Sequence, residues 1–274
     1  MLKLLFAVRK VKYAGWSSLM VVLLPSCSVI DSRIDGPPPQ PVDISSIPDA
    51  VPQFEPRSRY GNPDSYIVNG ERYHILNTSS GYVERGIASW YGRKFQGRRT
   101  SSGESYNMYA MTAAHRTLPL PTFVEVRNLN NGNRVIVRVN DRGPFHVNRI
   151  IDLSYAAALK LGIVRDGTGL VEVRAIDPGL YRPEIVRAKS VENTDINGFY
   201  LQVGSFSSYD NAVRLRNRLS GLADSLIHIS EVKVEDRKLY RVRFGPITDV
   251  DIADRLVLNL THIGISENNI LIDL

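Results

Sequence analysis

The chain has 274 residues, of which 43% are hydrophobic and 23% are charged, and its net charge is +6. This length favours two domains, each with a modest hydrophobic core. Four of the six net positive charges come from a short segment without acidic residues, at Lys3, Arg9, Lys10 and Lys12. The rest of the chain is only mildly basic, which argues against a nucleic-acid partner, because such proteins concentrate basic residues on one face.

The N-terminal segment has the features of an export signal. An apolar run from 14 to 24 follows the basic residues and is too short to span a bilayer as a stable helix. We therefore expect residues 1–26 to be a signal peptide. The single cysteine, Cys27, follows directly, so no disulfide can form within the chain. The order "LPSC" resembles a bacterial lipobox, which implies that Cys27 is lipidated, and the Ser28 that follows implies the outer membrane.

The next residues are rich in proline. Eight of the fifteen prolines lie between Gly36 and Pro63. A segment of this composition cannot bury enough apolar surface to fold, and it favours extended conformations. We predict that residues 27–63 form a tether that holds a domain away from the membrane.

Residues 64–177 show the pattern of a compact domain made mainly of strands. The segments "TFVEVRNL" (122–129) and "RVIVRVND" (134–141) alternate apolar and polar residues around "NNGN", which predicts a hairpin. The segments "RIIDLS" and "GLVEVRAID" predict two further strands. Between them, "SYAAALKLG" predicts a short helix that starts at Ser154 and ends before Gly162. Many short strands with one short helix are typical of a β-barrel.

The stretch from 89 to 119 has a different composition. It contains one Trp, three Tyr and five Lys or Arg residues, together with Glu104 and His115, and it shows little apolar periodicity. Its Gly and Ser content predicts loops that present side chains on a scaffold built by the rest of the domain.

A second predicted linker, residues 178–196, precedes a repeated pattern in residues 197–274. The segment "GFYLQVGSFSSYDNAVRLRNRL" predicts a strand, a turn and a helix, and "LYRVRFGPITDVDIADRLVLNL" repeats this order. With the strand-like "LIHISEVKV" and "NILIDL", the order becomes βαββαβ, an antiparallel sheet with two helices on one face. RNA-binding domains share this order, but "KLYRVRFGPI" lacks the stacked aromatic residues of an RNA-binding strand.

Several of these segments resemble known families. The segments "GIASWYGRKFQGRRTSSGESYNMYAMTAAHRTLP", "VRVNDRGPF" and "RIIDLSYAAALKLG" closely resemble the rare lipoprotein A family, and "FYLQVGSF" with "YRVRFGP" resembles a sporulation-related (SPOR) repeat domain. The resemblance covers about residues 64–274. It implies a double-psi β-barrel followed by a SPOR domain, lytic transglycosylase activity on peptidoglycan without cofactor or metal, and binding of glycan strands that lack stem peptides.

The resemblance places the acid/base on Asp141 in "NDRGPF", a second carboxylate on Glu104 and a polar orienting group on His115. Lytic cleavage needs a carboxyl group that protonates the leaving oxygen and then takes the proton of the sugar's C6 hydroxyl while an anhydro ring closes. Partial burial beside Phe145 would raise the pKa of Asp141 and keep a useful protonated fraction. Glu104 would stay ionised and offset positive charge in the transition state.

Each candidate also has a plainer interpretation. Asp141 could accept backbone N–H bonds in a turn, Glu104 could be a solvated loop charge, and His115 could be a structural histidine. Asp152 is the nearest competing carboxylate. Its place two residues before Ser154 favours bonds to backbone amides at a helix start.

Glycan strands without stem peptides expose a lactyl carboxylate on each muramic acid, and arginine can bind such a group bidentately. Four arginines are candidates for binding this carboxylate: Arg98, Arg99, Arg116 and Arg142. For at least two of them, the alternative is that they are ordinary surface charges. Trp90 and Tyr91 are the candidate aromatic contacts to sugar, with the hydrophobic core as their alternative.

In the predicted C-terminal sheet, strand alternation turns Leu201 and Val203 toward the helices. The opposite face is left to four polar residues, which we expect to bind glycan, with the last at the edge of the sheet: Gln202, Arg241, Arg243 and Ser205.

The sequence thus predicts a lipid-anchored endolytic lytic transglycosylase of the outer membrane that faces the periplasm. It would cleave β-1,4 bonds between MurNAc and GlcNAc and form 1,6-anhydro-MurNAc ends. The alternative is a non-catalytic protein that binds or loosens the wall, because the same barrel serves expansin-like roles. Denuded glycan and outer-membrane lipid are the expected partners. Cell-division proteins and a septal location are candidates that the residues themselves do not address.

Overall fold

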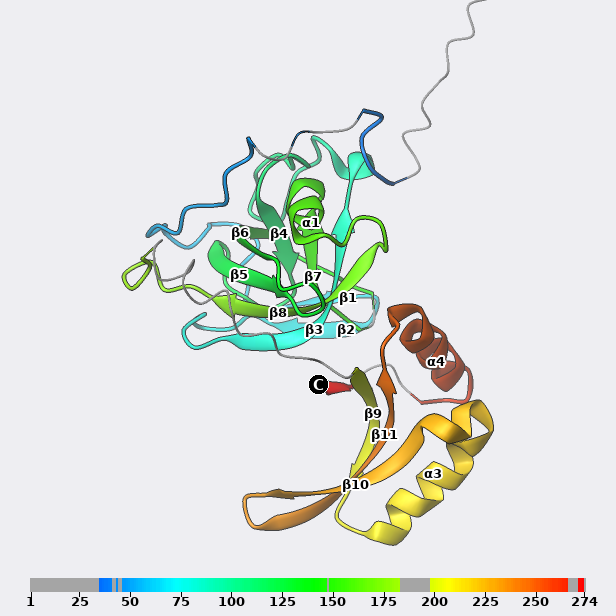
Figure 1. The fold of residues 1–274 in the computed structure, drawn as a ribbon. Helices are drawn as coiled ribbons and strands as arrows, with labels where there is room; N and C mark the ends of the chain where they lie inside the picture. Colours follow the sequence, from blue (N-terminus) through cyan, green and yellow to red (C-terminus); the bar gives the residue numbers. More distant parts are fainter. Residues whose placement is uncertain are drawn as a thin grey trace, which may run out of the picture. The chain divides into compact units, whose positions relative to one another are not determined.

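The computed structural model describes residues 35–40, 43, 46–146, 148–182, 198–265 and 271–273 (Figure 1). The expected signal peptide, the expected lipidation site Cys27 and most of the expected linker 178–196 lie outside these residues. Within the described ranges, every helix is too short or too polar to cross a membrane.

Six strands form a closed barrel in the order β3-β7-β4-β6-β5-β8. The pairs β3–β7 and β4–β6 are parallel, and the other neighbours are antiparallel. Closure pairs both edges of every strand, so the barrel exposes no open sheet edge. The strands are β3 (Val83–Tyr91), β4 (Thr112–His115), β5 (Thr122–Asn128), β6 (Arg134–Asp141), β7 (Arg149–Ser154) and β8 (Thr168–Ala175).

The predicted hairpin and helix are confirmed. The alternating valines of β5 and β6 point into the barrel, where each is at most 1% exposed: Val124, Val126, Val135, Val137 and Val139. Helix α1 (Tyr155–Leu161) begins after Ser154, whose hydroxyl accepts a hydrogen bond from the backbone N–H of Ala157. It ends at Gly162, which adopts a left-handed conformation with φ +80°. Its alanines lie in the same core as the valines.

The stretch 89–119 is only partly loop. Ser89–Tyr91 complete β3, a 3₁₀ turn η1 follows at Arg93–Phe95, and Thr112–His115 form β4 between β6 and β7. The prediction missed β4 because a four-residue strand is too short to show a period of two. Its small residues Ala113 and Ala114 are buried.

Residues 47–62, predicted as part of an extended tether, run along the barrel instead, and we call them the N-terminal strap (Figure 1). The backbone N–H of Ala50 donates to Ile136 O at 3.0 Å, and that of Ser58 donates to Leu120 O at 2.8 Å. The strap has no core of its own, so contacts with the barrel order it. A short antiparallel hairpin follows, formed by β1 (Ser65–Val68) and β2 (Glu71–His74).

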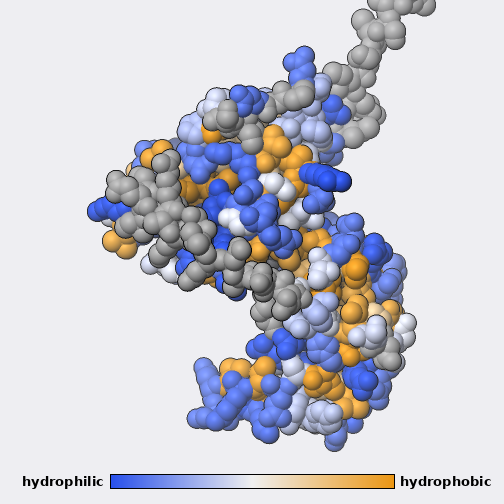
Figure 2. All heavy atoms as spheres, in the orientation of Figure 1, coloured by the Kyte–Doolittle hydropathy of each residue, from blue (hydrophilic) through white to orange (hydrophobic). Residues whose placement is uncertain are grey.

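The C-terminal domain has the predicted βαββαβ order. Strands β9 (Phe199–Phe206), β10 (Ile227–Val234), β11 (Arg237–Ile247) and β12 (Leu271–Asp273) form an antiparallel sheet in the order β10-β11-β9-β12. Helices α3 (Tyr209–Ala223) and α4 (Val250–His262) cover one face of it (Figure 1). Leu201, Val203 and Val242 are buried. Figure 2 shows a surface on which hydrophilic residues predominate, with apolar residues in smaller groups between them.

Candidate functional site

Asp141 lies at the end of β6, where its carboxyl group is held by the loop before β4. Its Oδ1 accepts three hydrogen bonds, from the backbone N–H and the hydroxyl of Ser101 at 2.8 and 2.7 Å and from the N–H of Arg142 at 2.7 Å. Among the residues that the structure describes, none donates to Oδ2. The carboxyl group is therefore oriented by one oxygen, and the other is left for a ligand.

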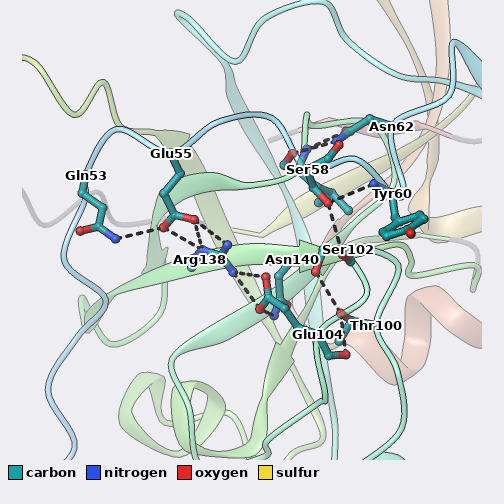
Figure 3. A network of polar contacts seen from close by, with 11 residues as sticks. Gln53, Glu55, Ser58, Tyr60, Asn62, Thr100, Ser102, Glu104, Arg138 and Asn140 are labelled. Carbon is teal, nitrogen blue, oxygen red and sulfur yellow. Dashed lines mark hydrogen bonds and ion pairs between the residues drawn. The ribbon is translucent and has the colours of Figure 1, made fainter.

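Glu104 comes from the same loop and is held by β6 (Figure 3). Arg138 Nη1 donates to both of its carboxylate oxygens at 2.8 and 2.9 Å, and Asn140 Nδ2 donates to Oε2 at 2.9 Å. Burial acts to raise the pKa of Glu104, but these hydrogen bonds outweigh it and hold the pKa below its usual value. Glu104 is therefore a positioned carboxylate near neutral pH, although 43% of its side chain is exposed.

The N-terminal strap takes part in this network (Figure 3). Arg138 Nε and Nη2 donate to the carboxylate of Glu55 at 2.6 to 3.1 Å, so one guanidinium joins Glu55 and Glu104. The strap also touches the loop directly, because Ser58 Oγ donates to Ser102 O at 3.2 Å. Gly61 has φ +76°, and a Cβ there would lie 2.6 Å from Ser101 O, so this close approach requires glycine.

His115 ends β4 and is only 2% exposed. Its Nδ1 accepts hydrogen bonds from the backbone N–H groups of Thr117 and Leu118, so the ring proton sits on Nε2, which donates to the Tyr82 hydroxyl at 2.8 Å. Tyr82 in turn donates to Glu84. Burial, and then the positive charges of nearby arginines, lower the pKa of His115 to about 3. The ring is therefore neutral near pH 7, and its Nε2, 4.0 Å from Glu84, makes no ion pair there.

Arg142 uses most of its donors on atoms of the protein itself. Its Nε donates to Gly61 O at 2.8 Å, its Nη1 donates to His115 O and Leu118 O at 3.0 and 2.6 Å, and its Nη2 donates to Asn62 Oδ1 at 3.0 Å. Four of the five N–H groups of a guanidinium are thus used. Burial lowers its pKa to about 10. These contacts run against its predicted role in gripping substrate.

The other predicted arginines are more accessible. Arg98 and Arg99 are exposed, and Arg116 is half-buried. Arg98 lies over the ring of Phe95 at 5.5 Å, and Arg99 Nη1 donates to Gly103 O at 3.0 Å within the loop that holds Asp141. These three remain candidates for binding an anionic sugar.

Trp90 and Tyr91 belong to the packing of the barrel. Tyr91 is 8% exposed and stacks on Tyr106 with ring centroids 4.2 Å apart. Trp90 is half-buried, with its ring 5.6 Å from that of Tyr155. Tyr91 is therefore a core residue, as the alternative interpretation expected. Trp90 packs against Tyr155 and is not an exposed aromatic surface.

Asp152 is not at the helix start. It lies within β7, and its Oδ1 accepts a hydrogen bond from the Ser89 hydroxyl rather than from backbone amides. Ser154 is the helix cap instead. Ala114 of β4 is the register partner of both Asp152 and Asp141, so the two aspartates are two strand spacings apart, roughly 10 Å between their Cα atoms. Burial raises the pKa of Asp152, against the Ser89 bond and nearby positive charges.

Within the described ranges, no three His, Cys, Asp or Glu side chains gather as metal ligands. The absence of a metal from the chemistry stays a prediction.

The open face of the C-terminal sheet brings the predicted polar residues together. Gln202 is the register partner of Arg243, and Ser205 is that of Arg241. Arg243 Nη2 donates to Ser230 Oγ at 2.6 Å, and its guanidinium lies 4.9 Å from the centre of the Tyr200 ring. Tyr200 and His228 extend this face, with their rings 5.4 Å apart.

Comparison with known proteins gives matches to both domains. Residues 83–174 match the family model described as lytic transglycolase, and residues 196–268 match the SPOR domain model. The endolytic peptidoglycan transglycosylase RlpA of Vibrio cholerae serotype O1 is 42% identical over 250 residues, which cover 90% of this chain and 92% of that protein. The chain belongs to the RlpA family.

The RlpA of Pseudomonas aeruginosa strain UCBPP-PA14, also called an endolytic peptidoglycan transglycosylase, is 40% identical over 272 residues, which cover 81% of this chain and 79% of that protein. Among solved structures, the SPOR domain of RlpA from Pseudomonas aeruginosa is 32% identical and covers 28% of this chain and 99% of that one, with a TM-score of 0.26.

Sequence reasoning missed three side chains of the network around Glu104, namely Arg138 and Asn140 of β6 and Glu55 of the strap. Glu55 lies before Val83, where the match to the lytic transglycolase model begins, and in a segment whose composition predicted a tether. A single carboxylate in a proline-rich segment gives no sequence signal of this contact.

Proposed function

We propose that this member of the RlpA family is an endolytic lytic transglycosylase. It cleaves the β-1,4 bond between MurNAc and GlcNAc in peptidoglycan and leaves 1,6-anhydro-MurNAc ends. The observation that carries the proposal is the Asp141 carboxyl group, which three donors orient through one oxygen. Two of these donors belong to Ser101, in the loop that also carries the positioned carboxylate of Glu104. The identity to relatives named endolytic peptidoglycan transglycosylase supports this class of reaction.

In the proposed reaction, the protonated Asp141 gives its proton to the glycosidic oxygen as the bond from this oxygen to C1 of MurNAc breaks. The C6 hydroxyl of the same MurNAc then attacks C1, and the Asp141 carboxylate takes the hydroxyl proton. The carboxyl group is restored and no water is consumed. Glu104, kept ionised by Asn140 and Arg138, stabilises positive charge on the oxocarbenium-like transition state.

Asp152 is the alternative for the proton transfer. A Cβ on Gly143, in the turn after Asp141, would lie 4.0 Å from Asp152 Oδ2, so the second carboxyl group borders the same turn. Burial raises its pKa, which is the direction that a general acid needs. Its substitution is therefore the matched control for Asp141.

The test is mass analysis of fragments released from purified peptidoglycan by the wild-type chain, Asp141→Asn and Asp152→Asn. We expect anhydro ends from the wild type and a rate about 10²- to 10⁴-fold lower for Asp141→Asn, with an unchanged melting temperature. Full activity of a folded Asp141→Asn chain together with an inactive Asp152→Asn chain would transfer the role to Asp152. A wild-type chain that binds walls without producing anhydro ends would favour the non-catalytic alternative.

We also propose that the chain is an outer-membrane lipoprotein that faces the periplasm, with acylated Cys27 as its anchor. The basic start, the short apolar run and "LPSC" support this location. Replacing Cys27 by Ala should release the chain from the outer-membrane fraction, as measured by fractionation and immunoblot. Retention of the Ala variant in that fraction would point to a different anchor.

For the SPOR domain, we propose binding to glycan strands that lack stem peptides. Amide and guanidinium groups on the open face can bind sugar hydroxyls and lactyl carboxylates along an extended strand. The register that brings Gln202 beside Arg243 and Ser205 beside Arg241 supports this surface.

A further inference from the structure

Three aromatic side chains meet near the turn that follows Asp141. Tyr66 of β1 and Tyr73 of β2 stack with ring centroids 5.3 Å apart. The ring of Phe145, in the loop after β6, lies 6.2 Å from that of Tyr66 and 5.8 Å from that of Tyr73. Phe145 is 38% exposed, and the two tyrosines are half-buried. The group is therefore a supported surface rather than part of a closed core.

This aromatic group borders the turn that follows Asp141. A Cβ on Gly143 would lie 3.8 Å from the Phe145 ring, on the same turn that approaches Asp152. Burial raises the pKa of Tyr66 to about 12, and the charges of Arg142, Arg116 and Asp141 act on it as well. The aromatic rings and the carboxyl groups of Asp141 and Asp152 therefore share one region of the barrel.

The aromatic group is held in place from two sides. The Tyr66 hydroxyl donates to Arg116 O at 2.8 Å. Arg142 binds Gly61 O and Asn62 Oδ1, directly before the hairpin that carries both tyrosines. A surface that is already fixed loses little conformational entropy when a ligand binds.

We propose that Tyr66, Tyr73 and Phe145 form an aromatic platform that binds one pyranose ring of the glycan strand next to the cleaved bond. The C–H face of a β-linked pyranose is flat and apolar, so it can cover the exposed ring of Phe145 and remove apolar surface from water. The platform would make the aromatic contacts to sugar that the sequence analysis predicted for Trp90 and Tyr91. It rests on the proposed function, because a glycan strand is the ligand.

The side chain of Arg116 adds a positive charge close to the platform. Its charge acts on Tyr66, and within the part of the chain that the structure describes its guanidinium has no hydrogen-bond partner. A muramic acid lactyl carboxylate on the neighbouring sugar can take that place. The platform and Arg116 together would distinguish a MurNAc-containing strand from an uncharged glycan.

The experiment is hydrogen–deuterium exchange of the full chain with and without a hexamer of β-1,4-linked GlcNAc, which supplies the pyranose faces without needing cleavage. We expect slower exchange in residues 65–74 and 142–146 with the hexamer, and loss of this protection in Phe145→Ala. Tyr109→Ala is the matched control, because Tyr109 is 39% exposed and outside the aromatic group. Phe145→Leu, which keeps apolar volume without a flat face, should behave like Phe145→Ala.

On peptidoglycan, Phe145→Ala should raise the substrate concentration for half-maximal release of anhydro ends about three- to tenfold, while Tyr109→Ala leaves it unchanged. Unaltered exchange in residues 65–74 and 142–146 with the hexamer would overturn the platform even if the enzyme is active. Protection without any anhydro ends would uphold the platform and refute the proposed activity. Equal protection in wild type and Phe145→Leu would overturn the stacking role.

Discussion

The barrel and the SPOR domain display their polar groups in different ways. In the barrel, Arg138 and Arg142 use most of their donors on carboxylates and carbonyls of the protein itself. In the SPOR sheet, Gln202, Arg241 and Arg243 line an open face above a buried apolar one. The barrel site is thus organised by the fold before substrate arrives. Changes there should cost stability, whereas changes on the SPOR face should alter binding alone.

The largest effect that would test this contrast is the pH dependence of folding stability that His115 causes. Burial lowers its pKa to about 3 in the folded chain, while an unfolded histidine titrates near its ordinary value of 6.5. Between these two values the unfolded state binds the extra proton, so stability falls as the pH drops below 6.5, by about 1.4 kcal/mol per pH unit. This loss of stability is complete once the pH is below the pKa of His115 in the folded chain.

His115→Gln removes this titration, because glutamine stays neutral and its amide oxygen can still accept a backbone N–H bond. The variant should be less stable than the wild type at pH 7, and the gap should shrink by roughly 2–3 kcal/mol by pH 4.5. Urea unfolding at the two pH values measures both gaps. An unchanged gap would show that His115 does not fold as a neutral, buried ring.

A smaller effect is expected from Arg142→Lys. Lysine keeps the charge but cannot reproduce four N–H bonds to Gly61, Asn62, His115 and Leu118, and it leaves carbonyls without donors. The cost should be about 1–3 kcal/mol of unfolding free energy.

The control is Arg98→Lys on the exposed surface, which should change stability by no more than about 0.5 kcal/mol. Urea unfolding of both variants gives the comparison. If Arg142→Lys kept full stability and instead weakened glycan binding, Arg142 would belong to the substrate site after all.

The two domains also differ in how much their sequences reveal. The SPOR face could be predicted because strand alternation and one-sided burial determine it locally, as the buried Leu201 and Val203 show. Helix α1 could also be predicted from local sequence, because Ser154 marks its start and Gly162 its end. In the barrel, the loop that carries Glu104 reaches Asp141 because β4 pairs in parallel with β6, and the spacing of residues in the sequence cannot reveal this pairing.

The misplaced Asp152 and the missed Glu55 have the same cause. In "RIIDLSYAAA" both Asp152 and Ser154 are acceptable helix caps, and only the pairing of β7 with β3 and β4 shows that Asp152 is inside a strand. Glu55 joins the site because barrel contacts order the strap, which its own composition does not favour. Tertiary context decided both positions, as it does wherever long-range pairing builds a site.

The smallest effect concerns the SPOR face. Gln202→Glu adds a negative charge next to Arg243, so it should repel lactyl carboxylates and weaken binding to denuded glycan by roughly 1 kcal/mol, about fivefold, without loss of stability. Asn217→Asp is the matched change of amide to acid on the exposed side of α3 and should leave binding as it is. Pelleting of the full chain with walls treated or untreated with an amidase measures both. Equal binding to the two wall preparations would refute the preference for denuded strands, and unchanged binding of Gln202→Glu would move the glycan off this face.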